Sequence, residues 1–241
     1  MDKKILIGNK SVKYYKNLLI KADLGLHEQV SEKIQEVLKP KSKILDLGAG
    51  EGAMSKRLTD LNYEVVSVDA NKEEFKCEEA TFYQVDFNNP EAVSSLSENF
   101  ENRFDLVLGM EVIEHVENPW QYIRLLKKML KGKGYLLITT PNITSWLSRI
   151  IFLFTGQFHQ FADIDLDYGH IAPISEWELR VILKKENFKN IKMYPAGTLP
   201  AVWLQKSKKY LFYNFTALIF RFFMKGIKDG WCIMCLAQKN N

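Results

Sequence analysis

The feature that most constrains the fold is a glycine-rich turn between a short apolar run and a helical pattern. Residues 43–47 (KILDL) form the apolar run, and three glycines follow within 48–52. Met54, Leu58 and Leu61 then recur about once per helical turn. This order predicts a strand, a tight turn whose backbone can approach a ligand closely, and a helix.

Further strands and helices are expected on both sides of this unit. A helical pattern covers 119–131, ending near Gly132. Apolar or alternating runs predict further strands at 64–68, 81–85, 104–108, 135–140, 191–194 and 231–237. Strands alternating with helices predict an α/β fold with a doubly wound, mostly parallel, seven-stranded sheet that binds ligands at the carboxyl ends of its strands.

The remaining segments are expected to be additions to this domain. The apolar spacing in residues 1–42 predicts two helices that form an N-terminal helical cap. The α/β domain then occupies 43–241, with insertions at about 141–174 and 195–230. Inserted segments of this length usually act as lids or binding elements.

Composition indicates an ordinary globular protein of the cytoplasm. The 241 residues contain three cysteines, which suit a reducing compartment. No apolar run is long enough to span a bilayer, and the start of the sequence does not resemble a signal peptide. Basic ends flank an acidic centre, which favours an anionic partner at the periphery, although a solvated lysine-rich surface explains the pattern equally well.

Acidic residues near the turn indicate which nucleotide the site accepts. Asp69 follows Gly48 by 21 positions at the end of a strand, where it can accept hydrogen bonds from ribose hydroxyls. The full GxGxxG fingerprint of dinucleotide sites is missing. Asp46 and Asp86 add negative charge that would repel a pyrophosphate and suits a ligand with a cationic centre.

At this point the sequence resembles the class I S-adenosylmethionine-dependent methyltransferases. ILDLGAGEG, VVSVDA, YQVDF, FDLVLGMEVIEHV and GYLLITTPN are similar to successive motifs of that family, in order, over about residues 44–142. The resemblance implies a Rossmann-like fold and S-adenosyl-L-methionine as cofactor. It also implies a set of cofactor-binding residues: Asp46, Gly48, Ala49, Gly50, Asp69, Ala70, Asp86, Phe87, Met110 and Glu111.

The EVIEH string carries the second chemical signal. In a helix, Glu111, Glu114 and His115 share one face and suit a divalent ion or a general base. The string is similar to one in ubiquinone-biosynthesis O-methyltransferases and in small-RNA 2′-O-methyltransferases, which implies Mg²⁺ or another divalent ion on these residues, joined by His170. Other members of the class carry the string without metal, with the glutamate toward the cofactor and the histidine toward the substrate. We therefore consider metal binding, base catalysis by His115 or His170, and a structural role.

An aromatic and basic segment bears on the acceptor. Residues 210–224 (YLFYNFTALIFRFFM) are almost entirely apolar and are flanked by lysines, and 146–154 repeats the pattern with Arg149 inside. This composition is that of an interfacial helix and fits peripheral contact with the inner membrane face or with a lipid-tailed acceptor. A helical cap, a homodimer interface and, less favoured, nucleic-acid binding fit the same composition.

Three functions follow for testing. The first is methylation of a hydroxyl on a sugar or a small or lipid-linked metabolite, without nucleic acid as a partner. The second is metal-dependent 2′-O-methylation of RNA, against which the acidic centre counts because an RNA groove needs a basic lining. The third is a non-catalytic module that binds the cofactor only.

Overall fold

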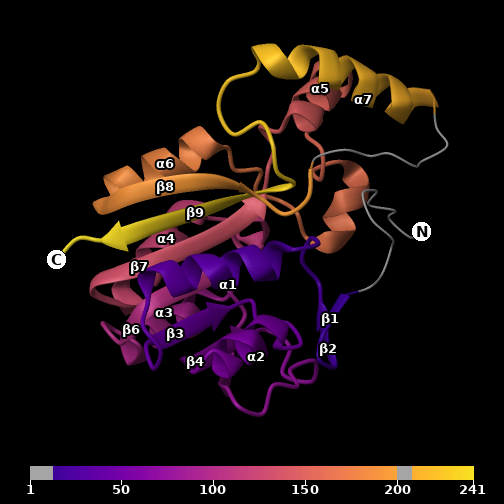
Figure 1. Ribbon diagram of the computed structural model, residues 1–241. Coiled ribbons are helices and arrows are strands. Elements are labelled where there is room, and N and C mark those ends of the chain that lie inside the picture. Colours follow the sequence, from indigo (N-terminus) through magenta and orange to yellow (C-terminus); the bar gives the residue numbers. More distant parts are fainter. Residues whose placement is uncertain (1–12, 200–207) are drawn as a thin grey trace.

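A seven-stranded sheet forms the centre of the chain (Figure 1). The computed structural model describes residues 13–199 and 208–241. The strands lie in the order β5 (Thr81–Gln84), β4 (Glu64–Asp69), β3 (Lys43–Leu47), β6 (Phe104–Met110), β7 (Leu130–Pro141), β9 (Cys232–Lys239) and β8 (Phe188–Ala196). β9 runs antiparallel to both of its neighbours, and all other neighbouring pairs are parallel. The predicted α/β, mostly parallel sheet is therefore confirmed.

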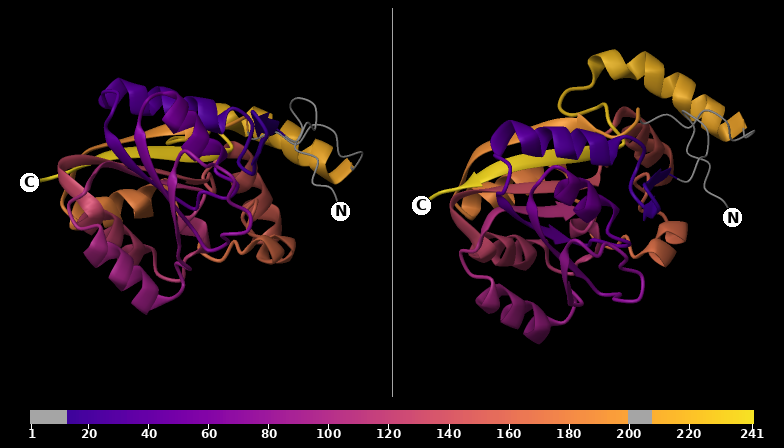
Figure 2. Two further views of the ribbon diagram at one scale, coloured as in Figure 1. Left: turned by 90° about the horizontal axis from the view of Figure 1, so that it is seen from below. Right: turned by 60° about the horizontal axis from the view of Figure 1, so that its bottom comes forward.

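Two hydrophobic clusters cover the two faces of this sheet. Figure 2 shows α1 on one side and α3 on the other. The first face carries α1 (Leu26–Val37) and α2 (Ala53–Asp60), and the second carries α3 (Pro90–Asn99), α4 (Pro119–Met129) and α6 (Glu176–Lys185). Because strand side chains alternate, Ile44 packs on the first face and Leu45 on the second.

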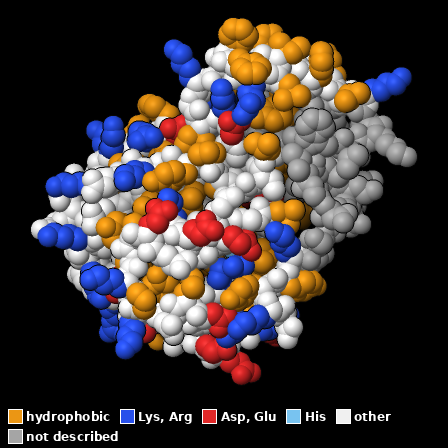
Figure 3. Space-filling model, viewed as in Figure 1, with side chains coloured by type: hydrophobic (Ala, Val, Ile, Leu, Met, Phe, Trp, Pro, Cys, Tyr) orange, Lys and Arg blue, Asp and Glu red, His pale blue; other side chains and the backbone are white. Residues whose placement is uncertain are grey.

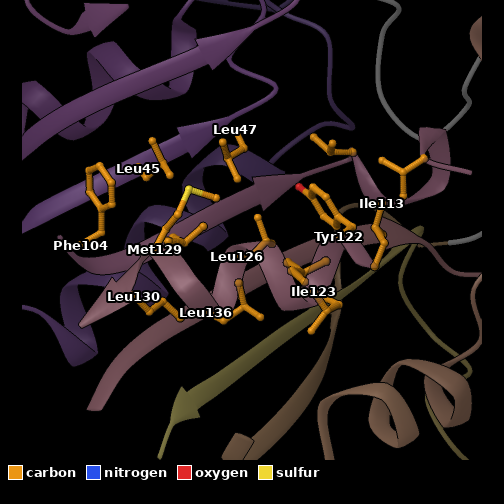
Figure 4. Close-up of a cluster of buried hydrophobic side chains, with 14 of the residues drawn as sticks. Leu45, Leu47, Phe104, Ile113, Tyr122, Ile123, Leu126, Met129, Leu130 and Leu136 are labelled. Carbon is orange, nitrogen blue, oxygen red and sulfur yellow. The ribbon is translucent and has the colours of Figure 1, made fainter. Parts of the chain in front are cut away.

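The second cluster is built mainly between α4 and the central strands. Figure 4 shows Leu126 and Met129 of α4 facing Leu45 and Leu47 of β3, with Phe104 at the start of β6. These side chains are almost wholly buried. The packing fixes the carboxyl ends of β3 and β6 relative to each other, which is where the glycine-rich turn and the EVIEH string begin.

The N-terminal segment differs from the prediction of two helices. Its described part starts with a hairpin of β1 (Lys13–Tyr15) and β2 (Leu18–Ile20), and only α1 is helical. Lys16 adopts a left-handed φ of 54°, which suits a tight hairpin turn. Leu18 and Ile20 alternate inward, so the apolar run that suggested a helix is a short strand. Residues 1–12 of the predicted cap lie outside the described residues.

The two insertions form a pair of packed helices. The first insertion contains α5 (Trp146–Thr155) and the 3-10 helix η2 (Asp163–Tyr168). The second contains α7 (Lys208–Phe220) and η3 (Arg221–Phe223), while its residues 200–207 are outside the described part. We call α5, α7 and η3 together the α5–α7 pair. Figure 1 shows the pair standing apart from the sheet at the top.

A small hydrophobic cluster and a polar neck hold the α5–α7 pair in place. The cluster consists of Trp146, Leu147, Ile150, Tyr213 and Ala217. Below it, the side-chain nitrogen of Asn142 donates to the backbone carbonyls of Ile227, Asp229 and Gly230, at 3.0–3.2 Å. Of the helices in the described ranges, none combines the length and the hydropathy needed to cross a bilayer.

Candidate active site

The glycine-rich turn at the end of β3 is shaped by close approach of its backbone to neighbouring elements. Gly48 has φ of 74°, and a Cβ atom there would overlap the Cγ2 atom of Val112. Gly50 has φ of 53°, but the nearest atom to a Cβ there is 3.9 Å away. Both positions favour glycine through their left-handed φ. Gly50, unlike Gly48, therefore leaves open space beside its backbone for a ligand.

Two aspartates bracket this turn in different environments. Asp46 is almost wholly buried and accepts a hydrogen bond of 2.6 Å from the hydroxyl of Ser55. Its burial raises the pKa of its carboxyl to about 7. Asp69 ends β4 and is only half-buried, accepting from the backbone nitrogens of Gly50 (2.8 Å) and Asn71 (3.0 Å). A cationic ligand in the cleft would favour the ionised form of Asp46.

One cleft joins the residues that the sequence singled out for the cofactor. Its volume is about 690 Å³, within the range of small-molecule sites. All ten residues expected to bind the cofactor line it: Asp46, Gly48, Ala49, Gly50, Asp69, Ala70, Asp86, Phe87, Met110 and Glu111. Within the described part of the chain, six carboxylate side chains and one lysine line the cleft. Their excess negative charge suits a cationic ligand and disfavours a phosphate-rich one.

The EVIEH string does not form the expected helical face. Glu111 has a left-handed φ of 52° and precedes the 3-10 helix η1 (Ile113–His115), so helical spacing does not apply to it. Its carboxylate accepts from the hydroxyl of Thr139 (2.7 Å) and lies 3.3 Å from the thiol of Cys232. Glu111 is not in the close group that Glu114, His115 and His170 form, because its carboxylate is held by Thr139 of β7 and Cys232 of β9.

The other three residues of that set lie together. A carboxylate oxygen of Glu114 and one ring nitrogen each of His115 and His170 lie within 4.8 Å of one another. Glu114 is fully buried, and its Oε1 has no hydrogen-bond partner among the described residues. Burial raises the pKa of Glu114 well above its ordinary value, and the nearby Glu111 raises it further. Burial also raises the pKa of Glu111, to about 7.

The two histidines are held by the same kind of hydrogen bond, from Nδ1 to a backbone carbonyl. Nδ1 of His115 lies 3.0 Å from the carbonyl oxygen of Gly169, and Nδ1 of His170 lies 2.8 Å from that of Gln160. A carbonyl oxygen can only accept, so the Nδ1 atom of each ring carries a proton, and in the uncharged form of such a ring Nε2 is the acceptor. The ring centroids are 5.0 Å apart. Burial lowers the pKa of His115, and the neighbouring His170 lowers it further, which keeps this ring neutral at pH 7.

Sequence reasoning missed one wall of the cleft. Lys21, Asp23 and His27 line it from the N-terminal segment, and Trp231 lines it from the position just before β9. His27 is buried on the same face of α1 as Val30 and Ile34. A polar residue on the apolar stripe of a helix was the available signal. For Trp231 the sequence offers no comparable signal.

Comparisons with known proteins agree with this geometry. Residues 23–193 match the family described as "Methyltransferase domain". A ubiquinone biosynthesis O-methyltransferase of Caulobacter vibrioides is 34% identical over 104 residues, which cover 42% of this chain and 41% of that protein. The chain thus aligns with less than half the length of this curated relative.

Solved structures share the fold across most of the chain. An S-adenosylmethionine-dependent methyltransferase from Archaeoglobus fulgidus superposes with a TM-score of 0.61 at 19% identity, covering 88% of this chain and 94% of that one. A protein from Thermotoga maritima, described as a possible histamine N-methyltransferase, gives a TM-score of 0.55 at 16% identity, covering 89% and 92%. At these identities the likeness concerns the fold alone.

Proposed function

Because the chain belongs to the class I S-adenosylmethionine-dependent methyltransferases, we propose that it methylates a hydroxyl group on a sugar or on a small or lipid-linked metabolite. The histidine pair, His115 and His170, carries this proposal, because a hydroxyl acceptor must lose a proton during methylation and both rings have Nδ1 held by a backbone carbonyl. The ubiquinone biosynthesis O-methyltransferases that match 42–47% of the chain support an oxygen acceptor. The fold does not select the acceptor atom, since one structural neighbour is described as a possible N-methyltransferase.

The chemistry of the cleft fits S-adenosyl-L-methionine. When bound, this cofactor supplies an electrophilic methyl group on a positively charged sulfur. We assign Asp46 and the backbone of Gly48, Ala49 and Gly50 to its methionine part, where the buried carboxylate of Asp46 would pair with the ammonium group. The open space beside Gly50 supports this placement.

The remaining residues of the cleft would hold the rest of the cofactor. Asp69 ends β4 half-buried and is suited to accept from ribose hydroxyls, with Ala70 beside it. Asp86 and Phe87 follow β5 and would contact the adenine. Met110 ends β6 and Glu111 follows it, and both would complete the wall toward the methyl group.

In the reaction, the histidine pair would bind and deprotonate the acceptor hydroxyl. Nε2 of either ring would accept the proton, while the carbonyl oxygens of Gly169 and Gln160 hold the rings in the required tautomer. Both rings line the cleft, so an acceptor that reaches them also reaches the cofactor side. Positioned general bases of this kind contribute roughly 10²- to 10⁴-fold to a rate.

The test is labelled methyl transfer from S-adenosyl-L-methionine into separated lipid, glycan and RNA fractions, followed by substrate panels within the labelled fraction. We expect label on oxygen in the lipid or glycan fraction. The double variant His115→Gln with His170→Gln should lower turnover by about 10²-fold or more, while leaving cofactor affinity within about twofold. Label only in RNA, or on nitrogen or carbon, would refute the proposal. Absence of cofactor binding would refute the catalytic assignment and its Asp46 site together.

A divalent ion on Glu114, His115 and His170 is a second way to activate the same hydroxyl. The donor set fits, because both histidines donate Nδ1–H to carbonyls, as metal-binding histidines do, and Oε1 of Glu114 lacks a described partner. Such an ion would lower the pKa of a bound hydroxyl. This route is favoured if EDTA abolishes activity and Mg²⁺ or Mn²⁺ restores it. The metal-dependent activity should then be missing in Glu114→Gln and present in the exposed control Glu117→Gln. Full activity in EDTA would eliminate it.

A further inference from the structure

The outer face of the α5–α7 pair exposes an unusual number of large hydrophobic side chains. We define these as the apolar patch: Phe152, Leu153, Phe154, Leu211, Phe212, Phe215, Leu218, Ile219, Phe220, Phe222 and Phe223. Phe222 and Phe223 are 80% and 81% exposed. Figure 3 shows hydrophobic side chains gathered over α7 at the top of the molecule. Contiguous exposed apolar surfaces of this kind mark sites of interaction.

α7 has apolar side chains on both of its sides, and among the described residues only one side is packed against another element. Tyr213 and Ala217, four residues apart, pack into the small cluster with α5. Phe215 and Ile219, also four residues apart, are exposed. A helix that is apolar all round is normally buried in a core or a membrane. The packing seen within this chain therefore accounts for one side of α7 and leaves the other unexplained.

The charges around the patch identify the kind of surface that would cover it. Residues 146–155 and 208–228 contain no Asp or Glu. Lys208 and Lys225, at the two ends of α7 and η3, are exposed, and Figure 3 shows Lys and Arg side chains at the margin of the patch. An apolar surface with a basic rim matches a bilayer whose headgroups are anionic.

A second copy of the chain matches this surface less well. A twofold dimer would place the same patch on itself and bring the exposed Lys208 and Lys225 of the two copies into one interface, while the neighbouring Asp229 is already paired with Arg221 within the chain. α7 has 13 residues and is about 20 Å long, well short of the bilayer's hydrocarbon thickness, so it suits a position in the plane of the membrane surface.

The α5–α7 pair is anchored beside the cleft. Backbone nitrogens of Asn142 and Trp146 donate to the carbonyls of Trp231 and Lys228, at 2.9 Å each. Trp231 itself lines the cleft, and its ring packs edge-on against the ring of His159, at 4.8 Å. A surface held by the pair would therefore lie near the opening through which an acceptor enters.

From these observations we infer that the apolar patch and its basic rim dock the enzyme on an anionic lipid bilayer, in the plane of the headgroups. The purpose of this docking rests on the proposed function. A lipid-linked acceptor would be presented to the cleft from the membrane on which the enzyme is docked. The physical evidence for docking is independent of catalysis.

The test is flotation of the full chain with vesicles, without cofactor or acceptor. Vesicles of phosphatidylglycerol and phosphatidylcholine in equal amounts are compared with phosphatidylcholine alone. We expect at least about tenfold stronger binding to the anionic vesicles. Phe222→Ser with Phe223→Ser should weaken binding by about tenfold or more, and the matched control Tyr14→Ser, an exposed aromatic on the N-terminal hairpin, should not.

Charge variants test how much the lysines at the rim contribute to vesicle binding, separately from the apolar patch. Lys208→Glu and Lys225→Glu should each weaken binding to anionic vesicles by roughly fivefold, and Lys189→Glu, exposed on β8, should leave it unchanged. Cofactor affinity measured by calorimetry verifies that each variant is folded. Binding to neither vesicle would overturn the inference and leave the proposed function standing. A stable dimer in light scattering that the double phenylalanine variant dissociates, without vesicle binding, would overturn it in favour of self-association.

Discussion

The cleft and the α5–α7 pair lie at the same end of the sheet, where the parallel strands have their carboxyl ends, but they differ in which side chains they bury and expose. In the cleft, carboxylates such as Asp46 are buried and hydrogen-bonded, and the turn beneath them is packed against Val112. On the pair, hydrophobic side chains are exposed and acids are missing. Two large clusters support the first region, and one cluster of five residues supports the second. Most of the buried hydrophobic side chains therefore support the cleft, and the outer face of the pair remains available for contact with another surface.

The largest contrast should appear when the same change is made in a glycine of each region. Gly48 and Gly156 have similar left-handed φ values, 74° and 71°, but only Gly48 is crowded. Gly48→Ala should lower the free energy of unfolding by about 3 kcal/mol through strain and overlap with Val112. Gly156→Ala, at the end of α5 with open space around it, should cost about 1 kcal/mol. Denaturant unfolding and cofactor calorimetry measure both, and equal losses would contradict the contrast.

Asp46→Asn should change affinity and stability in opposite directions. Loss of the charge should weaken binding of S-adenosyl-L-methionine by roughly 30-fold, about 2 kcal/mol. The free protein should gain stability at pH 8, because a buried carboxyl with its pKa raised to about 7 destabilises the fold once it ionises. The control is Asp105→Asn, which lies near the start of β6, at the end of the strand away from the cleft. If Asp46→Asn lowered the free energy of unfolding at pH 8, burial could not be the cause of the raised pKa of Asp46.

The same carboxyl predicts how cofactor affinity depends on pH. With the pKa of Asp46 raised to about 7 in the free protein, its carboxylate is mostly protonated at pH 6. Because the ammonium group binds the ionised form, affinity should rise between about pH 5 and pH 7 and level off above it. Calorimetry across this range checks the curve, and Asp46→Asn should flatten it.

Tyr213→Ala should loosen the pair without affecting the cleft. Tyr213 is among the five buried residues that join α7 to α5. Its truncation should lower the free energy for opening of α7 by about 1.5 kcal/mol, less than for a core aromatic because so small a cluster can relax. Hydrogen exchange of the α7 amides should quicken, while cofactor affinity stays the same. A parallel fall in cofactor affinity would show that the two regions are coupled.

The smallest effect is expected at the exposed face of the pair. Phe222→Ser should change the free energy of unfolding by no more than about 0.5 kcal/mol, since the ring is mostly exposed. Thermal and denaturant unfolding provide the measurement. A larger loss would mean that the patch serves the stability of the fold and not an external partner.

The half of the site nearest the glycine-rich turn could be predicted because its chemistry is local in sequence. A strand, three glycines and an acid at the next strand end suffice to bring Gly50 and Asp69 together. The bounds of β3 and the parallel order of the central strands followed from the same alternation of apolar runs. The roles assigned to these residues in cofactor binding remain predictions.

The other half depends on contacts between distant parts of the chain, which periodicity does not encode. The side chain of Asp23 accepts from the backbone nitrogen of Thr198, 175 positions away. Glu111 is turned toward Thr139 of β7 and Cys232 of β9, and the helical spacing expected for EVIEH does not apply to it. The hairpin at Lys16 was missed because three-residue strands are too short for alternation to distinguish them from helices.

The position of β9 also has a consequence for how the protein is made. β9 inserts between β7 and β8, although the ribosome completes it after both. Until then, the nascent chain carries a 12-residue strand, β7, with one row of backbone groups unpaired. Such an edge pairs readily with other chains. The hydrophobic helix α7 emerges just before β9, so the chain is most exposed to aggregation immediately before the strand that completes the sheet.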